Sequence, residues 1–191
     1  MLTTGAIALT PTFRFDAGAF SLEFLLSGAV DPWEQLHQPA DLAAWIGRSS
    51  LGVTEPVAVE EGDLEAAKRL RSAVQTLAEA AVAGEALPGA AVEVLNAFAA
   101  APTVVPVLGA ELRRGWASPV TATQYLSAVA RDGIDLFGGS RLDRVRMCAG
   151  DRCALIFYDT SRPGARRWCS MDRCGNRSKL KTRRGRATIT P

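Results

Sequence analysis

The chain has 191 residues, of which 48% are hydrophobic and 22% charged, and its formal net charge at pH 7 is +2. This composition supports a buried core and argues against a disordered chain. The small net charge hides an asymmetry. Residues 1–140 contain 8 Lys and Arg against 16 Asp and Glu, whereas residues 141–191 contain 14 Lys and Arg against 4 Asp and Glu. The net charges of −8 and +10 predict two parts with different electrostatic partners.

The start of the chain, MLTTGAIALTPTFRF, has no basic segment, and Pro11 and Arg14 interrupt a short apolar stretch. This pattern is not typical of a signal peptide. No stretch approaches the roughly 18 uninterrupted apolar residues that a membrane-spanning helix needs. We therefore expect a cytoplasmic protein that makes no membrane contact.

Residues 63–83 have the clearest helical pattern in the chain. Apolar side chains recur there at three- and four-residue spacing, with Asp63 placed to cap the helix and Gly84 to end it. Shorter patterns predict further helices near residues 20–25, 42–46, 92–98 and 124–137. Between the first two of these, the single histidine, His37, is interpreted as a surface or cap residue. Trp33 and Trp45 are interpreted as core residues.

Residues 103–118, TVVPVLGAELRRGWAS, depart from the helical pattern. They are rich in β-branched residues and carry a turn signal at Gly109, which predicts a short β-hairpin. TFRFD, residues 12–16, is a candidate for an additional edge strand. Gly138-Gly139-Ser140 then coincides with the charge reversal. We place a boundary there, between a mostly helical domain at 1–140 and a basic domain at 141–191.

All four cysteines lie in the last 44 residues, as two CxxxxC pairs separated by fifteen residues. Two short pairs at such a spacing bring four thiolates to one tetrahedral metal centre. The pattern predicts one structural Zn²⁺ ion, because a catalytic zinc would keep an open coordination position. The predicted ligands are Cys148, Cys153, Cys169 and Cys174. Disulfides and a redox-sensing role remain open as alternatives.

The sequence around the cysteines predicts a small zinc module. Residues 154–159 (ALIFYD) and 165–168 (ARRW) are expected to form a hairpin, and residues 175–186 (GNRSKLKTRRGR) a polar helix. The whole chain is thus predicted to be α+β, with a helical domain followed by a treble-clef or ribbon-like module. In that module we expect Phe157 and Trp168 in the core and Tyr158 exposed on the opposite face.

Fourteen basic residues in the last 51 exceed what charge compensation at one zinc site requires. The excess predicts a cationic face for phosphate groups, and hence nucleic acid, DNA or RNA, as a partner. Asn176 either caps the following helix or contacts a base, and capping is favoured. The candidate contact residues are Arg166, Arg167, Arg173, Asn176, Arg177, Lys179, Lys181, Arg183 and Arg184.

The run RRWCSMDRCGNRSK at 166–179, with the CxxxxC pair and F-x-D at 157–159, resembles the CGNR zinc-finger family. SLEFLLS (21–27) and DLAAWI (41–46) are similar to motifs of its alanine-rich companion, the ABATE domain. The resemblance implies a bacterial stress-response transcription regulator with a helical domain and zinc on the four cysteines. The chain departs from the family at Glu23 and Leu26, where Asp and Asn are usual.

Three functions follow as hypotheses of unequal weight. The first is a non-enzymatic, zinc-dependent nucleic-acid-binding regulator whose acidic domain senses a ligand, dimerises or contacts proteins. The second is a zinc-stabilised interaction module whose basic face docks on an acidic protein surface, including the chain's own acidic domain. The third and weakest is an enzyme, since the sequence has no nucleophile elbow, phosphate loop or HExxH.

Overall fold

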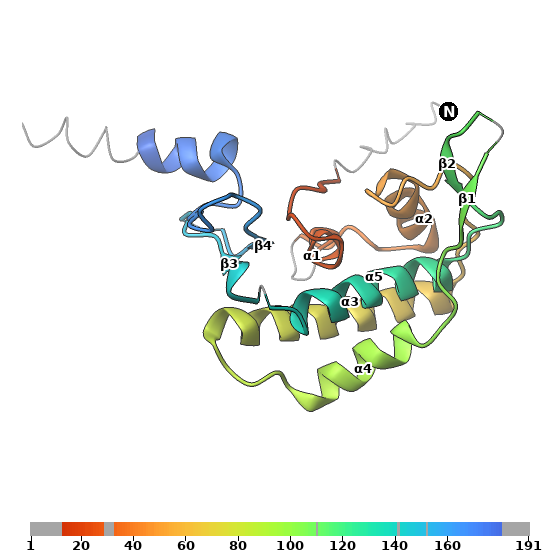
Figure 1. Ribbon diagram of the computed structural model, residues 1–191, viewed down its shortest axis with the longest axis horizontal. Helices are drawn as coiled ribbons and strands as arrows, with labels where there is room; N and C mark the ends of the chain where they lie inside the picture. The colour runs from red at the N-terminus through yellow and green to blue at the C-terminus, as the bar shows by residue number, and fades with distance from the viewer. Residues whose placement is uncertain (1–12, 29–32, 110, 141, 152, 181–191) are drawn as a thin grey trace, which may run out of the picture.

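The computed structural model describes residues 13–28, 33–109, 111–140, 142–151 and 153–180 (Figure 1). Residues 13–140 are called the helical part below and contain α1 (Phe20–Leu25), α2 (Pro39–Arg48), α3 (Glu61–Ala83), α4 (Gly89–Ala99), β1 (Pro106–Leu108), β2 (Arg114–Trp116) and α5 (Ala122–Phe137). Residues 142–180 are called the cysteine module and contain η1 (Leu142–Arg144), β3 (Val145–Met147), β4 (Ile156–Tyr158) and the π-helical turn η2 (Met171–Gly175). The predicted α+β class is confirmed.

The long helix α3 begins and ends through local signals. Glu60 precedes it, and the Glu60 amide donates a 3.0 Å hydrogen bond to the Asp63 carboxylate, which forms part of a capping box. The helix begins at Glu61, two residues before Asp63. Asp63 therefore lies in the first turn, and Glu60 is the residue at the cap position. Gly84 ends the helix at φ 70°, a conformation that glycine adopts without strain, as predicted.

The helices pack in three layers. In Figure 1, α3 and α5 run side by side, α1 and α2 lie on one side of them, and α4 lies on the other. The centre of the core is Trp45, which is fully buried and donates a hydrogen bond to the Tyr125 hydroxyl at 2.9 Å. The rings of Phe13 and Phe15 lie 4.9 and 4.6 Å from the Trp45 ring.

Two expectations for the helical part are wrong. Residues 13–16 form no strand, because Phe13 and Phe15 are used to cover Trp45 instead of pairing at a sheet edge. Trp33 is 65% exposed and not a core residue. It lies in the connection between α1 and α2, where no helical periodicity constrains the direction of the side chain.

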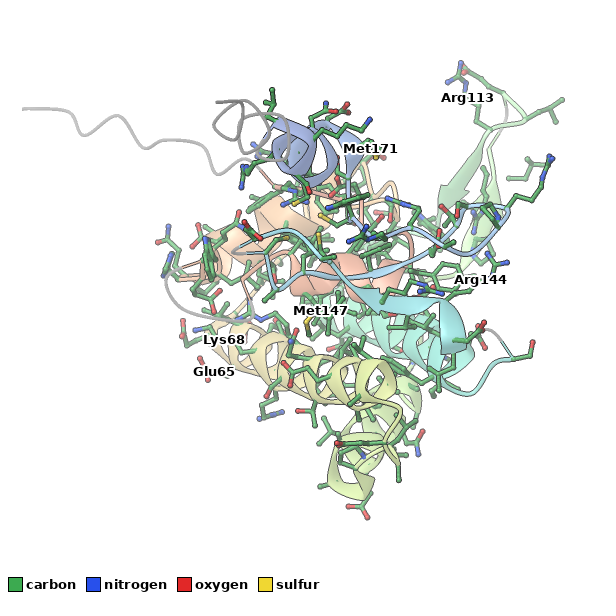
Figure 2. The ribbon with its side chains drawn as sticks, turned by 90° about the vertical axis from the view of Figure 1, so that its left-hand side faces the viewer. Glu65, Lys68, Arg113, Arg144, Met147 and Met171 are labelled. Atoms are coloured by element: carbon green, nitrogen blue, oxygen red, sulfur yellow. The ribbon has the colours of Figure 1, made fainter. Side chains whose placement is uncertain are left out.

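The predicted hairpin at 103–118 is confirmed. Strands β1 and β2 pair antiparallel, with Val107 opposite Gly115. The Trp116 indole donates to the Leu51 carbonyl at 2.8 Å, which fastens the base of the hairpin to the connection between α2 and α3. Figure 2 shows that Arg113, near the turn, projects away from the body of the molecule.

The cysteine module packs directly on the helical part. Val145 of β3 and Ile156 of β4 are buried in the same hydrophobic core as the helices. The Tyr158 amide donates to the Ala17 carbonyl at 2.7 Å, and the Tyr158 side chain is half-buried against that core. Tyr158 is therefore not the exposed residue that strand alternation predicted, because the face opposite Phe157 meets the helical part.

The predicted partner of β4 is also wrong. Strand β4 pairs antiparallel with β3, with Phe157 opposite Arg146, whereas residues 165–168 form no strand. The hairpin therefore encloses the first cysteine pair as its turn instead of joining the two pairs. Residues 176–180 are α-helical, as expected for the start of the polar helix. No helix among the described residues has the length and apolar character needed to span a membrane.

Candidate metal centre

The structure brings all four cysteines into one cluster. Their Sγ atoms all lie within 4.8 Å of one another. The Cys169 sulfur lies 3.9 Å from that of Cys153 and 3.8 Å from that of Cys174. A tetrahedral zinc with Zn–S bonds of about 2.3 Å requires sulfur separations of about 3.8 Å. The cluster therefore fits one structural Zn²⁺ ion.

The turn between β3 and β4 positions the first cysteine pair. The Cys148 amide donates to the Leu155 carbonyl at 2.9 Å, and the Cys153 amide donates to the Gly150 carbonyl at 3.0 Å. Gly150 lies so close to the sulfurs that a Cβ atom there would be 3.0 Å from the Cys174 Sγ. Gly150 was not singled out from the sequence, although a glycine between two predicted ligands is a usable signal of close backbone approach.

The turn η2 positions the second pair. The amides of Cys174 and Gly175 both donate to the Ser170 carbonyl at 3.1 Å. Because the helical turn begins at Met171, Asn176 lies within the helix and does not cap its start. The expected capping role of Asn176 is therefore wrong.

Hydrogen bonds join the two cysteine pairs and shift the pKa values of their thiols. The Cys169 amide donates to the Cys148 Sγ at 3.3 Å. Burial alone would raise the pKa of Cys148, but hydrogen bonds from the amides of Cys169 and Gly150 hold the pKa of this thiol below its ordinary value. Burial raises the pKa of Cys174 to about 12, so zinc must displace a proton there at neutral pH.

An internal brace supports the cluster. Phe157 is fully buried against the cysteines, and the Arg166 guanidinium lies 5.1 Å from the centre of its ring. Arg166 also donates from Nη2 to the Cys169 carbonyl at 2.6 Å. The buried Asp159 carboxylate accepts from the amides of Arg166 at 2.7 Å and Ser161 at 2.9 Å. Phe157 and Asp159, the two defined residues of the F-x-D pattern, therefore both support the metal site.

Removing the Asp159 charge tests this brace. Burial would raise the pKa of Asp159, but hydrogen bonds from Ser161 and the Arg166 amide outweigh it and lower the pKa. We expect Asp159→Asn to weaken these bonds and to destabilise the zinc-loaded module by about 1–3 kcal/mol at pH 7. Zinc loss to a competing chelator measures the effect, with exposed Asp143→Asn as the matched control. Equal zinc loss from both variants would contradict the supporting role of Asp159.

Two further arginines hold the loop that follows β4. Arg144 donates from Nη1 to the carbonyls of Asp159 at 3.1 Å and Ser161 at 2.8 Å. Arg146 donates from Nη2 to the Gly164 carbonyl at 2.7 Å. Part of the positive charge of the module is therefore used internally, which a count of basic residues does not reveal.

The predicted nucleic-acid contacts divide into three groups. Arg173 is ion-paired with Asp16 of the helical part, and the Arg166 guanidinium bonds within the module. Arg167, Asn176, Arg177 and Lys179 are exposed, and Arg167 lies 4.9 Å from the ring centre of Trp168. Lys181, Arg183 and Arg184 lie outside the described residues.

A second group of polar side chains ties the helices together. Asp132 of α5 accepts hydrogen bonds from both the amide and the hydroxyl of Ser21 at 2.7 Å, which fixes α1 to α5. Glu23 is buried and accepts from the Ser50 hydroxyl at 2.7 Å. Burial, followed by repulsion from Asp132 and Asp16, raises the pKa of Glu23.

A helical part carrying a packed four-cysteine module places this protein among the zinc-finger proteins. Residues 18–140 match the family model ABATE, described as "putative stress-induced transcription regulator", and residues 144–187 match the model of the CGNR zinc finger. The chain belongs to the ABATE family and carries a CGNR zinc finger, which confirms the resemblance seen in its sequence. Neither is an enzyme family. A comparison with curated proteins finds no match.

Proposed function

We propose that this protein is a cytoplasmic, zinc-dependent nucleic-acid-binding regulator without catalytic activity. In this proposal Cys148, Cys153, Cys169 and Cys174 bind one structural zinc ion, and the module around it contacts phosphate groups. The division into two domains at residue 140 is part of the proposal. The helical part then carries the regulatory function, through a small ligand, a protein partner or a second copy of the chain.

The observation that carries the proposal is the separation of two faces on the cysteine module. The contact with the helical part uses the β3–β4 hairpin, through Val145, Ile156 and Tyr158, and the ion pair of Arg173 with Asp16. The helix at 176–180 lies outside that contact, and its Arg177 and Lys179 are exposed, with no ion pair to another described residue. A cationic helix is thus presented to solvent, where phosphate groups can reach it.

Electrostatics favours this face of the cysteine module as the place where a nucleic acid binds. Residues 141–191 have a net charge of +10 and residues 1–140 a net charge of −8, so a polyanion is attracted to the module and repelled by the helical part. Arg167 is exposed and Trp168 is half-buried beside it. Arg167 can therefore contribute a phosphate contact next to a partly accessible ring.

The test is a binding measurement with charge-neutralising variants. Zinc-loaded protein is titrated into labelled duplex DNA and single-stranded RNA at about 50 and about 200 mM salt, and fluorescence anisotropy is recorded. We expect the affinity to fall steeply between the two salt concentrations, because bound cations release counterions from the polymer. Arg177→Gln combined with Lys179→Gln is expected to weaken binding about tenfold or more at the lower salt and to reduce the salt dependence.

A matched control removes the same charge elsewhere. Arg69 on α3 and Arg113 on the β1–β2 hairpin are both exposed, and Arg69→Gln with Arg113→Gln changes the net charge by the same amount. This control is expected to bind like the unmodified protein. An equal loss in both double variants would show that binding follows net charge and not the helix after Cys174.

One observation favours the interaction-module hypothesis as the second candidate. Arg173 is ion-paired with Asp16, so one arginine of the module already contacts the acidic part of the same chain. Burial would raise the pKa of Asp16, but its hydrogen bonds and charge interactions with Arg173 and Arg14 lower it. If neither polymer binds even at low salt, the basic face is made for an acidic protein surface and this candidate replaces the first.

A further inference from the structure

Three arginines lie at the base of the β3–β4 hairpin and in the turn that follows it. Val145 of β3 is buried in the core shared with the helices, so the next side chain along the strand, Arg146, points to the opposite face. Arg144 directs its guanidinium to the same loop after β4 that Arg146 contacts. Arg162 is exposed within that loop. These three residues, Arg144, Arg146 and Arg162, are called the arginine face below.

Two of the guanidinium groups meet at Gly164. The Arg146 Nη2 donates to the Gly164 carbonyl at 2.7 Å. A Cβ atom at Gly164 would lie 3.5 Å from the Arg144 Cζ, so both guanidinium groups lie against this one residue. Arg162 belongs to the same turn, which the Gly164 amide closes by donating to the Ser161 carbonyl at 3.2 Å. Three positive charges therefore gather around one turn, an arrangement that favours a bound anion.

The hydrogen bonds of these arginines orient the guanidinium groups but do not neutralise them. Arg144 donates from Nη1 to two backbone carbonyls, and the acceptor for Arg146 is also a carbonyl. The Nε of Arg146 has no hydrogen-bond partner among the described residues. None of the three arginines forms an ion pair with a described residue. The cations are thus positioned before any ligand binds, and their charge is still available.

The nearby carboxylates do not balance the arginine face. Asp159 is fully buried, its oxygens accept from backbone amides, and it interacts with the charge of Arg166. Asp143 is exposed and has no ion pair with a described residue. Asp132 and Asp135 of α5 line a cavity that includes none of the three arginines. Even when Asp143 is counted against them, the three arginines leave two positive charges in excess.

We propose that the arginine face binds a phosphate group. A phosphate group offers three acceptor oxygens and up to two negative charges, which matches several guanidinium groups better than a carboxylate with one charge does. In Figure 2, Arg144 lies well apart from Met171, with which η2 begins, so this site is separate from the helix that follows η2. The phosphate belongs either to a nucleic-acid backbone, which would then contact the module at two places, or to a small phosphorylated molecule.

The first experiment follows the Nε–Hε signals of the three arginines by NMR in the zinc-loaded full chain. Inorganic phosphate is the probe, and acetate at the same ionic strength is the comparison. We expect phosphate to shift the three signals saturably and to bind at least about fivefold more tightly than acetate, because it carries more charge. The signal of Arg69, an exposed residue of α3, is expected to stay in place.

Two results of this titration would overturn the proposal. The first is the absence of a saturable shift with phosphate. The second is equal affinity for acetate, which would assign the arginine face to carboxylates and hence to an acidic protein surface.

A variant locates the site without disturbing the loop. Arg162 is exposed, so Arg162→Gln removes one charge and leaves the carbonyl contacts of Arg144 and Arg146 intact. We expect it to weaken phosphate binding about threefold. Arg69→Gln removes the same charge from α3 and is expected to bind phosphate like the unmodified protein. Equal affinities of the two variants would place the phosphate elsewhere and overturn the site.

A short oligothymidine distinguishes the two sources of the phosphate group. It is titrated into the variant that combines Arg177→Gln with Lys179→Gln, so that the helix at 176–180 contributes little to binding. Shifts of the same three arginine signals support a nucleic-acid backbone, whereas shifts with inorganic phosphate alone support a small phosphorylated molecule. Because inorganic phosphate is the primary probe, the test of the arginine face stands even if the helix at 176–180 binds no nucleic acid.

Discussion

Replacing Cys169 by serine is expected to release the zinc ion and unfold residues 148–180, while the helical part stays folded. The cluster inside the module consists of Phe157 and three buried cysteines, a core too small to be stable without a metal. Structural zinc supplies about 10–16 kcal/mol of apparent binding free energy in small zinc peptides. Amide NMR spectra and the zinc content of the purified variant measure the result.

The matched control for Cys169→Ser is Ala154→Ser, which also introduces a hydroxyl but at an exposed position between the first cysteine pair and β4. It is expected to retain one equivalent of zinc and a dispersed amide spectrum for residues 148–180. The structural role of zinc would be wrong if the zinc-loaded and zinc-free proteins gave the same spectrum in this region. General unfolding of Cys169→Ser, with collapse of the α3 and α5 signals, would instead show that the two parts fold as one unit.

Trp45 and Trp33 have opposite environments, so their removal is expected to change the stability by very different amounts. Trp45→Ala is expected to destabilise the helical part by about 3–5 kcal/mol, because it leaves a large cavity in the core. It also removes the donor to the Tyr125 hydroxyl, which is fully buried. Burial raises the pKa of Tyr125, so this hydroxyl stays neutral and needs a hydrogen-bond partner at all ordinary pH values.

Trp33→Ala supplies the comparison, since the same side chain is removed from a position that is 65% exposed. We expect a change within about 0.5 kcal/mol for this variant. Urea unfolding followed by circular dichroism at 222 nm measures both free energies. Similar destabilisation by the two substitutions would contradict the assignment of Trp45 as the centre of the core.

In the proposed function, zinc binding and nucleic-acid binding depend on the same segment. Cys174 is followed directly by Gly175 and Asn176, so the helix that presents Arg177 and Lys179 begins within the second cysteine pair. A metal that holds η2 in place therefore also fixes the position of the helix that carries Arg177 and Lys179. The polymer affinity of the unmodified protein should then decline in parallel with its zinc content, a dependence that the anisotropy measurement can follow.

The features that depend on neighbouring residues could be predicted from the amino-acid sequence. The helix of α3, its end at Gly84, the hairpin at 103–118 and the four-cysteine cluster all follow from local spacing, because helical periodicity, turn residues and paired thiols each act over a few positions. The α+β class and the zinc site were predictable for the same reason.

The partners that these elements meet are set by long-range packing and could not be predicted from local patterns. Strand β4 pairs with β3 and not with residues 165–168, and Trp33 is exposed whereas Trp45 is buried. Pattern and composition identify an apolar or charged side chain, but they do not identify its distant partner. The same holds for Arg166, which braces Phe157, and for Arg173, which is paired with Asp16.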